Sequence, residues 1–256
     1  MPGNLNLLSV IIPAKDEGEN LIPTISNLRS TLSQAAIPFE ILIVDDYSKD
    51  NTQALLAGLS NDHPEIRSEI NSKESGFGNA IQEGFKHMQG DAAVIFMADE
   101  SDSPKDVAVY WNKLNEGHDC VFGSRFNKKA KVIDYPIPKL LLNRLANKFI
   151  QVIFGIRLND TTNAFKAYRK EVIDGCQPLL SPHFNLTVEL PLKAIIRGYS
   201  WSTVPTTWQN RKRGTAKFKI KEMGSRYLFI IFYAWLEKFF SRGDYHRSKN
   251  SSIQRN

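Results

Sequence analysis

The chain has 256 residues, 42% of them apolar, which is enough to bury a sizeable core in one large domain and argues against disorder of the whole chain. The formal net charge of +6 is a small excess of 33 basic over 27 acidic residues, so its position along the chain says more about partners than its size. Two cysteines are too few for a disulfide framework, which favours a reducing compartment and core positions for Cys120 and Cys176.

Short apolar strands alternate with helical segments through the first half of the chain. Strands are predicted at 7–12, 40–44, 92–97 and 120–122, and helices at 20–34, 79–88 and 104–115. Each predicted strand is apolar throughout, as a strand should be when helices cover both faces of its sheet. This alternation is typical of an α/β fold with a mostly parallel sheet flanked by helices.

The N-terminal apolar stretch has no basic region before it and turns polar after about seven residues, so we expect a strand there rather than a secretory signal. Nowhere do about 18 to 20 apolar residues follow one another, and we therefore expect any membrane contact to be peripheral.

Two amphipathic helices are predicted in the less regular second half, over 138–154 and 225–240. The later helix is rich in aromatic and aliphatic residues beside basic clusters, so we expect residues 221–245 to lie in a membrane interface. Two alternatives to membrane contact are that both helices pack on the sheet, or that the later helix packs on a second subunit. Residues 246–256 are expected to be disordered.

Charged side chains follow all four predicted strands, and three of the four groups contain carboxylates: Lys15 to Glu17, Asp45 and Asp46, Asp99 to Asp102, and Ser124 with Arg125. Ligands of open α/β sheets bind beyond the carboxyl ends of the strands, where these groups should meet. The alternative is that the carboxylates cap the helices that follow.

Seven segments in order resemble the pattern of glycosyltransferase family 2 on a GT-A fold. They are SVIIPAKDEGENL, EILIVDDYSKDNT, SGFGNAIQEGF, VIFMADESDSP, GSRF, NDTTNAFKAYRKEV and RKRGTAKF. Their order and spacing are similar to those of the enzymes in this family that use dolichyl or other polyprenyl phosphates. The resemblance covers about residues 5 to 220 and implies a GT-A domain over 1–220.

The resemblance implies a nucleotide-binding set in the first half of the chain. Pro13 and Glu17 match residues that hold the nucleoside, and Asp46 matches a carboxylate that contacts the base or ribose. Gly76, with Gly78, matches a loop in which the backbone must pass close to other groups. Lys15 replaces the family's usual aromatic residue, which points to a phosphate or ribose contact. Ala98 and Asp99 complete this set.

A divalent cation, Mg²⁺ or Mn²⁺, is implied as the cofactor, because transfer leaves negative charge on the departing diphosphate. Asp99 matches the second carboxylate of the family's Asp-x-Asp motif, but Met97 replaces the first. The predicted ligands are therefore Asp99 with Ser101 or Asp102, of which Asp102 is preferred, and phosphate oxygens.

The resemblance also implies acceptor-binding residues, namely Arg125, Thr161, Asn163, Glu189, Arg211 and Lys217. Arg211 and Lys217 lie in a basic segment with the pattern Arg-x-x-Gly-x-x-Lys, whose positive charges suit phosphate. Asp160 would orient an acceptor or, for a hydroxyl acceptor, take its proton. Glu189 could instead neutralise Arg211. The predicted catalytic residues are Asp99, Asp160, Arg211 and Lys217.

The function implied is inverting transfer of a sugar from a nucleoside diphosphate sugar to a polyprenyl phosphate, by a peripheral protein on the cytoplasmic face of a membrane. Two alternatives stay open, a family 2 enzyme acting on a saccharide hydroxyl and an inactive nucleotide-binding or membrane scaffold. Nucleic acid is not an expected partner, because the basic residues lack interleaved stacking aromatics. The oligomeric state, the base and the sugar are not predicted.

Overall fold

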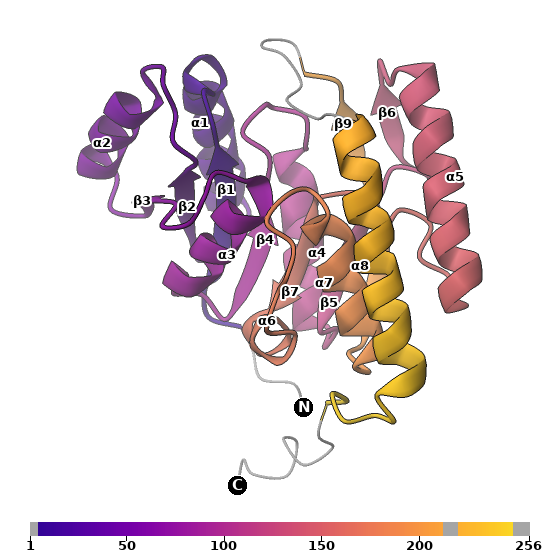
Figure 1. Ribbon diagram of the computed structural model, residues 1–256. Coiled ribbons are helices and arrows are strands. Elements are labelled where there is room, and N and C mark those ends of the chain that lie inside the picture. Colours follow the sequence, from indigo (N-terminus) through magenta and orange to yellow (C-terminus); the bar gives the residue numbers. More distant parts are fainter. Residues whose placement is uncertain (1–4, 212–219, 248–256) are drawn as a thin grey trace, which may run out of the picture.

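The computed structural model describes residues 5–211 and 220–247, with side chains described from residue 224 in the last helix. Its centre is a seven-stranded sheet in the order β3-β2-β1-β4-β7-β5-β8 (Figure 1). The strands are β1 (Leu8–Ala14), β2 (Phe39–Asp45), β3 (Ile66–Ile70), β4 (Ala92–Ile95), β5 (Cys120–Ser124), β7 (Lys166–Arg169) and β8 (Trp201–Pro205). All neighbours are parallel except that β7 runs antiparallel to both β4 and β5. The mostly parallel α/β fold is thus confirmed.

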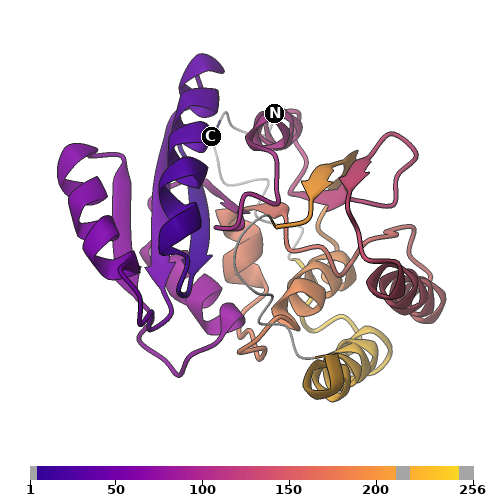
Figure 2. The same ribbon diagram turned by 90° about the horizontal axis from the view of Figure 1, so that it is seen from above.

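Helices cover both faces of the sheet (Figure 2). One face carries α1 (Gly18–Gln34), α2 (Thr52–Asp62) and α4 (Pro104–Asn115), and the other carries α3 (Phe77–His87), α6 (Lys170–Gly175) and α7 (Leu186–Ile196). Strand β1 shows why its sequence is mostly apolar: Val10 and Ile12 pack into the first layer, and Ile11 packs into the second. Each such buried side chain stabilises the fold by about 1.5–3 kcal/mol.

The remaining elements lie outside the seven-stranded sheet. Two short strands, β6 (Lys131–Ile133) and β9 (Thr207–Gln209), form a separate parallel pair. The helices α5 (Ile137–Phe154) and α8 (Ile220–Phe240) lie side by side (Figures 1 and 2) and pack together with α7 in a third apolar cluster. Both predicted amphipathic helices are present, and α8 begins five residues before the predicted 225. The predicted tail at 246–256 falls almost wholly outside the described residues.

No helix within residues 5–211 and 220–247 is long and apolar enough to cross a membrane. Both cysteines are buried and unpaired, as predicted. Elements not predicted include α2 and β3, of which β3 has the alternating sequence IRSEI and lies at the edge of the sheet. Strand β7 was not predicted either, because its four residues contain a lysine and an arginine.

Candidate active site

Asp46 holds several loop residues in place at the edge of the sheet where the parallel strands end. Its carboxylate accepts hydrogen bonds from Asn71 Nδ2 at 2.7 Å, Ser75 Oγ at 2.9 Å and the Gly76 N–H at 3.0 Å. Lys15 also lies here, with its Nζ 3.9 Å from Asp46 Oδ2 and hydrogen-bonded to Ser75 Oγ. The first loop and the loop before α3 are therefore held together by one buried carboxylate.

Two glycines at the start of α3 permit a close approach of the chain to itself. A Cβ at Gly76 would lie 2.3 Å from the Pro182 carbonyl oxygen, and one at Gly78 would lie 2.2 Å from the Ser181 carbonyl oxygen. Both distances are far inside van der Waals contact, so neither position can carry a side chain without moving the backbone of residues 181–183. The close approach expected from the sequence is present, and its partner is the protein's own backbone.

Asp99 lies opposite Arg211, although 112 positions separate them in the chain. Arg211 Nη2 donates to Asp99 Oδ2 at 2.6 Å, and Arg211 Nη1 lies 3.7 Å from Glu17 Oε1. The other oxygen of Asp99 accepts the Ser101 N–H at 3.1 Å. The structure thus brings a first-loop acid, the predicted metal carboxylate and the predicted phosphate-binding arginine to one place.

Asp102 differs from Asp99 in its surroundings. Burial, reinforced by the negative charge of Asp99, raises the pKa of Asp102 from 3.8 to about 8. Its Oδ2 accepts the Met97 N–H at 3.3 Å. The two carboxyl groups that the sequence predicts as metal ligands therefore lie close enough for the charge of Asp99 to act on Asp102.

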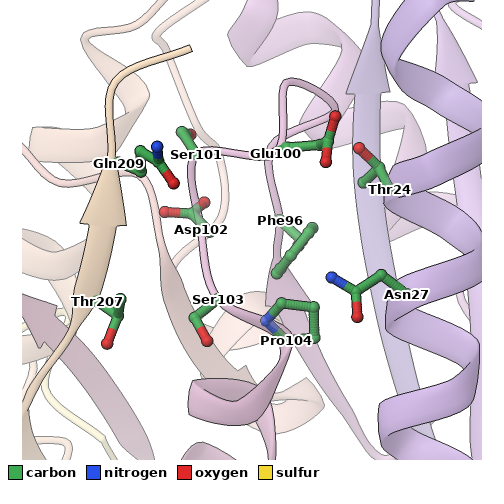
Figure 3. Close-up of a pocket in the computed structure, with 10 residues that line it drawn as sticks. All are labelled: Thr24, Asn27, Phe96, Glu100, Ser101, Asp102, Ser103, Pro104, Thr207 and Gln209. Atoms are coloured by element: carbon green, nitrogen blue, oxygen red, sulfur yellow. The ribbon is translucent and has the colours of Figure 1, made fainter. Parts of the chain in front are cut away.

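A pocket of about 270 Å³ opens beside Ser101 and Asp102. In Figure 3 Phe96 lies between the helix that carries Thr24 and Asn27 and the strand that carries Thr207 and Gln209. The ten residues that line the pocket are mostly polar: Thr24, Asn27, Phe96, Glu100, Ser101, Asp102, Ser103, Pro104, Thr207 and Gln209. Hydroxyl, amide and carboxyl groups of this kind suit a polar molecule rather than an apolar one.

The residues present fit a cation only together with a substrate phosphate. Within the described parts of the chain no group of three or more His, Cys, Asp or Glu side chains could hold a metal ion. Magnesium is commonly bound through one or two carboxylates plus phosphate oxygens and water. Asp99, with the nearby Ser101, fits that second mode of binding.

Arg125 and Asp160 form a buried pair that the sequence did not predict. Arg125 Nε and Nη2 donate to the two oxygens of Asp160 at 2.9 and 2.8 Å, and the Arg125 N–H adds a third bond at 2.8 Å. Burial opposes the charged form, but the Asp160 carboxylate outweighs it and raises the pKa of Arg125 above its usual value. Both oxygens of Asp160 are engaged and fully buried. Asp160 is therefore not placed to accept a proton from an acceptor.

The loop 160–163, which precedes β7, is fixed from several sides. Asn147 Oδ1 accepts the N–H groups of Thr161 at 2.6 Å and Thr162 at 3.3 Å, while Asn163 Nδ2 donates to the Gly123 carbonyl at 3.0 Å. Thr161 and Asn163 are both buried. The Asn163 side chain thus holds the loop to β5, whereas the buried Thr161 hydroxyl has no hydrogen-bond partner among the described residues.

Glu189 does not lie at the site, contrary to the expectation from the sequence. Its side chain is fully buried, accepts the N–H groups of Leu180 and Ser181 at 2.8 Å each, and pairs with Lys193 at 2.8 Å. It neutralises Lys193 and not Arg211. What Glu189 does hold in place is the segment that lies against Gly76 and Gly78.

One further basic residue near the site, Lys139, was not predicted. Lys139 Nζ lies 5.7 Å from the ring centroid of Tyr135 and 5.8 Å from that of Trp208. Burial and the positive charges of Arg125 and Arg211 lower the pKa of Lys139. The only signal in the sequence was its position near the start of the predicted amphipathic helix.

The binding roles of Pro13, Ala98 and Lys217 stay predictions. Pro13 lies at the carboxyl end of β1 opposite Val44, and the Ala98 carbonyl accepts the Thr24 hydroxyl at 3.0 Å. Lys217 lies outside the described residues.

Comparison with known proteins places the chain in a family. The model of a family described as glycosyl transferase family 2 matches residues 9–176. A polyprenol monophosphomannose synthase from Mycolicibacterium smegmatis is 29% identical over 233 residues, covering 85% of this chain and 86% of that protein. A dolichol-phosphate mannosyltransferase from Pyrococcus furiosus is 33% identical over 218 residues, covering 84% of this chain but 60% of that protein.

Solved structures agree in fold. A mycobacterial protein has a TM-score of 0.71 at 16% identity, covering 90% of this chain and 74% of its own. Glucosyl-3-phosphoglycerate synthase from Mycobacterium tuberculosis, solved with Mn²⁺, uridine diphosphate and phosphoglyceric acid, has a TM-score of 0.69 at 15% identity, covering 90% and 78%. The chain therefore has the GT-A fold and is a glycosyltransferase that belongs to glycosyl transferase family 2.

Proposed function

We propose that the protein transfers a sugar from a nucleoside diphosphate sugar to a polyprenyl phosphate, with inversion at the anomeric carbon. The observation that carries this proposal is the 2.6 Å contact between Asp99 and Arg211. It joins a carboxylate suited to a cation with a guanidinium suited to phosphate at the same sheet edge. The names of the two relatives, a polyprenol monophosphomannose synthase and a dolichol-phosphate mannosyltransferase, support the same acceptor class.

On the donor side, Lys15, Glu17 and Asp46 would position the nucleoside, and Asp99 with Ser101 would hold Mg²⁺ or Mn²⁺ together with the diphosphate. When bound, the cation neutralises charge on the leaving diphosphate. Arg211 is placed to add positive charge at the same point.

On the acceptor side, the chemistry of the described residues favours a phosphate over a hydroxyl. A phosphate oxygen is already anionic near neutral pH and needs positioning rather than deprotonation. It would attack the anomeric carbon from the side opposite the diphosphate, forming the new C–O bond as the bond to the diphosphate breaks. A hydroxyl would need a base, but Asp160, the acid predicted for that role, is buried and paired with Arg125, and Glu189 is buried and paired with Lys193.

Arg211 and Lys139 are the described basic residues best placed for the acceptor phosphate, since their charges act on each other beside Asp99. Lys217, in the basic segment Arg-x-x-Gly-x-x-Lys, would add a further positive charge for the same phosphate.

The membrane contact is proposed for the outer faces of α5 and α8. Each helix exposes a stripe of large apolar side chains: Ile137, Leu141, Leu145, Phe149 and Val152 on α5, and Leu228, Phe229, Phe232, Leu236, Phe239 and Phe240 on α8. Contiguous exposed apolar surface of this kind is typical of protein or lipid contacts. Exposed Arg144 and Lys148 on α5 suit an anionic lipid surface, as at the cytoplasmic face of a membrane.

The test is transfer by the purified protein, with Mn²⁺, from a panel of nucleotide sugars to a polyprenyl phosphate. We expect turnover for at least one donor, and loss of about 100-fold or more for Asp99→Ala, because the leaving diphosphate loses its cation. Asp62→Ala, an exposed carboxylate at the end of α2 and away from the site, is the matched control and should keep activity within a few-fold.

Other outcomes select other functions. Transfer to free sugars but not to the lipid phosphate would support the hydroxyl-acceptor alternative. Absence of turnover together with absence of metal-dependent nucleotide binding would support the scaffold alternative and contradict the proposal.

A further inference from the structure

A lysine is buried in the sheet, and no carboxylate of the described residues is in contact with its amino group. Lys166 is the first residue of β7 and is 1% exposed. Its Nζ donates to the carbonyl oxygens of Thr161 at 2.9 Å, Thr187 at 3.2 Å and Asn163. Burial lowers the pKa of Lys166 to about 7; in its protonated form the group has three N–H donors and no acceptor, so all three donors are used.

Burying a charge is costly unless hydrogen bonds replace its hydration. An apolar residue at this position would carry no such cost, and yet three main-chain carbonyls converge on the ammonium group. The arrangement is therefore specific to a side chain with a long stem and three donors. Two of the carbonyls belong to the loop 160–163, and the third belongs to the first turn of α7.

The loop that Lys166 holds is the one that sets Arg125. Asp160 begins the loop and takes three hydrogen bonds from Arg125. Arg125 in turn lies 5.6 Å from the ring centroid of Tyr135, the same ring that Lys139 approaches. A shift of the loop would therefore move Arg125 and the Tyr135 ring beside it, which also lies next to Lys139, a residue proposed for the acceptor phosphate. Asp46 and Asp99 lie on other loops.

We propose that Lys166 is a positioning residue for acceptor binding: it fixes the loop 160–163 to α7 and thereby sets Asp160 and Arg125. This rests on the proposed function for its kinetic consequence. Lys166 itself is fully buried and touches no substrate.

The test compares Lys166→Met, which keeps the length of the stem and removes the three donors, with the wild-type chain. Val172→Ala, a core substitution in α6 away from the loop, is the control for general loss of stability. The kinetic readouts are KM for the polyprenyl phosphate, KM for the donor, and kcat. Amide hydrogen exchange at Thr161 and Thr162 gives a structural readout that needs no substrate.

For Lys166→Met we expect the acceptor KM to rise at least fivefold with the donor KM within twofold, and exchange at Thr161 and Thr162 to quicken at least tenfold. Val172→Ala should change neither the ratio of the two KM values nor these amides. Lys166→Gln, which is shorter but retains two N–H donors, serves if the methionine variant does not fold, and should show smaller changes in the same direction.

Two results would overturn the proposal: equal effects on both KM values, or unchanged exchange at Thr161 and Thr162 in a folded variant. If the wild-type chain transfers no sugar to a polyprenyl phosphate, the proposed function fails by itself. The exchange comparison then still decides whether Lys166 holds the loop.

Discussion

Two carboxylates three positions apart, Asp99 and Asp102, have opposite environments. Asp99 is paired with Arg211 at 2.6 Å, so the positive charge of the guanidinium group balances the charge of the Asp99 carboxylate. Among the described residues no basic side chain forms an ion pair with Asp102, and burial and the charge of Asp99 raise its pKa to about 8 although Arg125 acts in the opposite direction. Environments that separate two neighbouring carboxyl groups in this way usually separate their roles. In the structure without a cation, Asp102 therefore holds its proton near neutral pH.

This difference gives a pH prediction. Because the folded-state pKa of Asp102 is raised from 3.8 to about 8, the folded protein holds an extra proton between these two values. The stability that this proton provides is lost as the pH rises towards about 8. The variant Asp102→Asn stays neutral at every pH. Its stability towards unfolding should therefore rise relative to that of the wild type as the pH rises from about 5 to 9. We expect a gap of roughly 3 °C or more in the unfolding midpoint at pH 9.

Thermal unfolding without metal measures this gap, and Glu116→Gln, at an exposed surface position, is the control. Parallel midpoint curves for Asp102→Asn and the wild type would show that the carboxyl group ionises normally.

Some site residues could be predicted from the sequence and others could not, for a physical reason. Asp46, Asp99 and Arg211 lie in short motifs, and the structure groups Asp99 with Arg211 and ties Asp46 to Lys15. Lys139 and Lys166 carry no local signal, because their partners are rings and carbonyls brought close only by folding. Arg125 was predicted from a motif, but its pairing with Asp160, 35 positions away, was not.

At the scale of elements, α5 and α8 stand out because they expose apolar side chains while their inner faces are packed. Ile150 and Phe154 of α5 and Ile230, Ile231 and Ala234 of α8 are buried together. The exposed stripe is therefore additional to what the fold needs. A surface that contributes nothing to folding can be changed without loss of structure, which makes it testable.

The triple substitution of Phe229, Phe232 and Phe239 by serine should weaken binding to vesicles of phosphatidylcholine and phosphatidylglycerol at least tenfold, because each aromatic side chain contributes about 1.5–3 kcal/mol when fully buried. Sedimentation with vesicles is the measurement. Ile70→Ser, at an exposed apolar position on β3, is the matched control. Unchanged vesicle binding would contradict the membrane role, and a loss of dimers in solution would favour a subunit contact.

Elements were predictable where the hydrophobic pattern was strong. The helix predicted at 104–115 has the same bounds as α4, since Pro104 starts it and apolar residues recur on one face. Helix α2 was missed because it buries few side chains and its pattern is weak. Strands β6 and β9 are three residues each, too short for a period to be read.

At the scale of the whole molecule, a buried ion pair joins α8 to the rest of the chain. Arg197 donates to the two oxygens of Glu237 at 2.7 and 3.0 Å, and also to the Gly175 carbonyl at 2.7 Å. Farther along, the Arg247 N–H donates to the Arg197 carbonyl at 2.8 Å. The helix proposed to meet the membrane is thus fixed to the catalytic body rather than hinged on it.

Removing one partner of this pair should be costly. Glu237→Leu leaves the Arg197 charge buried and uncompensated, and we expect a loss of about 3–5 kcal/mol. That corresponds to a fall of roughly 6–20 °C in the unfolding midpoint. The double variant Arg197→Met/Glu237→Leu should recover much of the loss, because no lone charge remains. Equal midpoints for the single and double variants would contradict this account.

The reversed direction of β7 has a consequence for how sequences of this fold are read. A parallel strand delivers to the ligand-binding edge the residues that come after it, whereas a strand of opposite direction delivers the residues that come before it. In this chain the 160–163 loop reaches that edge by entering the sheet, while the residues following β7 leave at the far side. Candidate substrate contacts should therefore be sought upstream of this one strand and downstream of all the others.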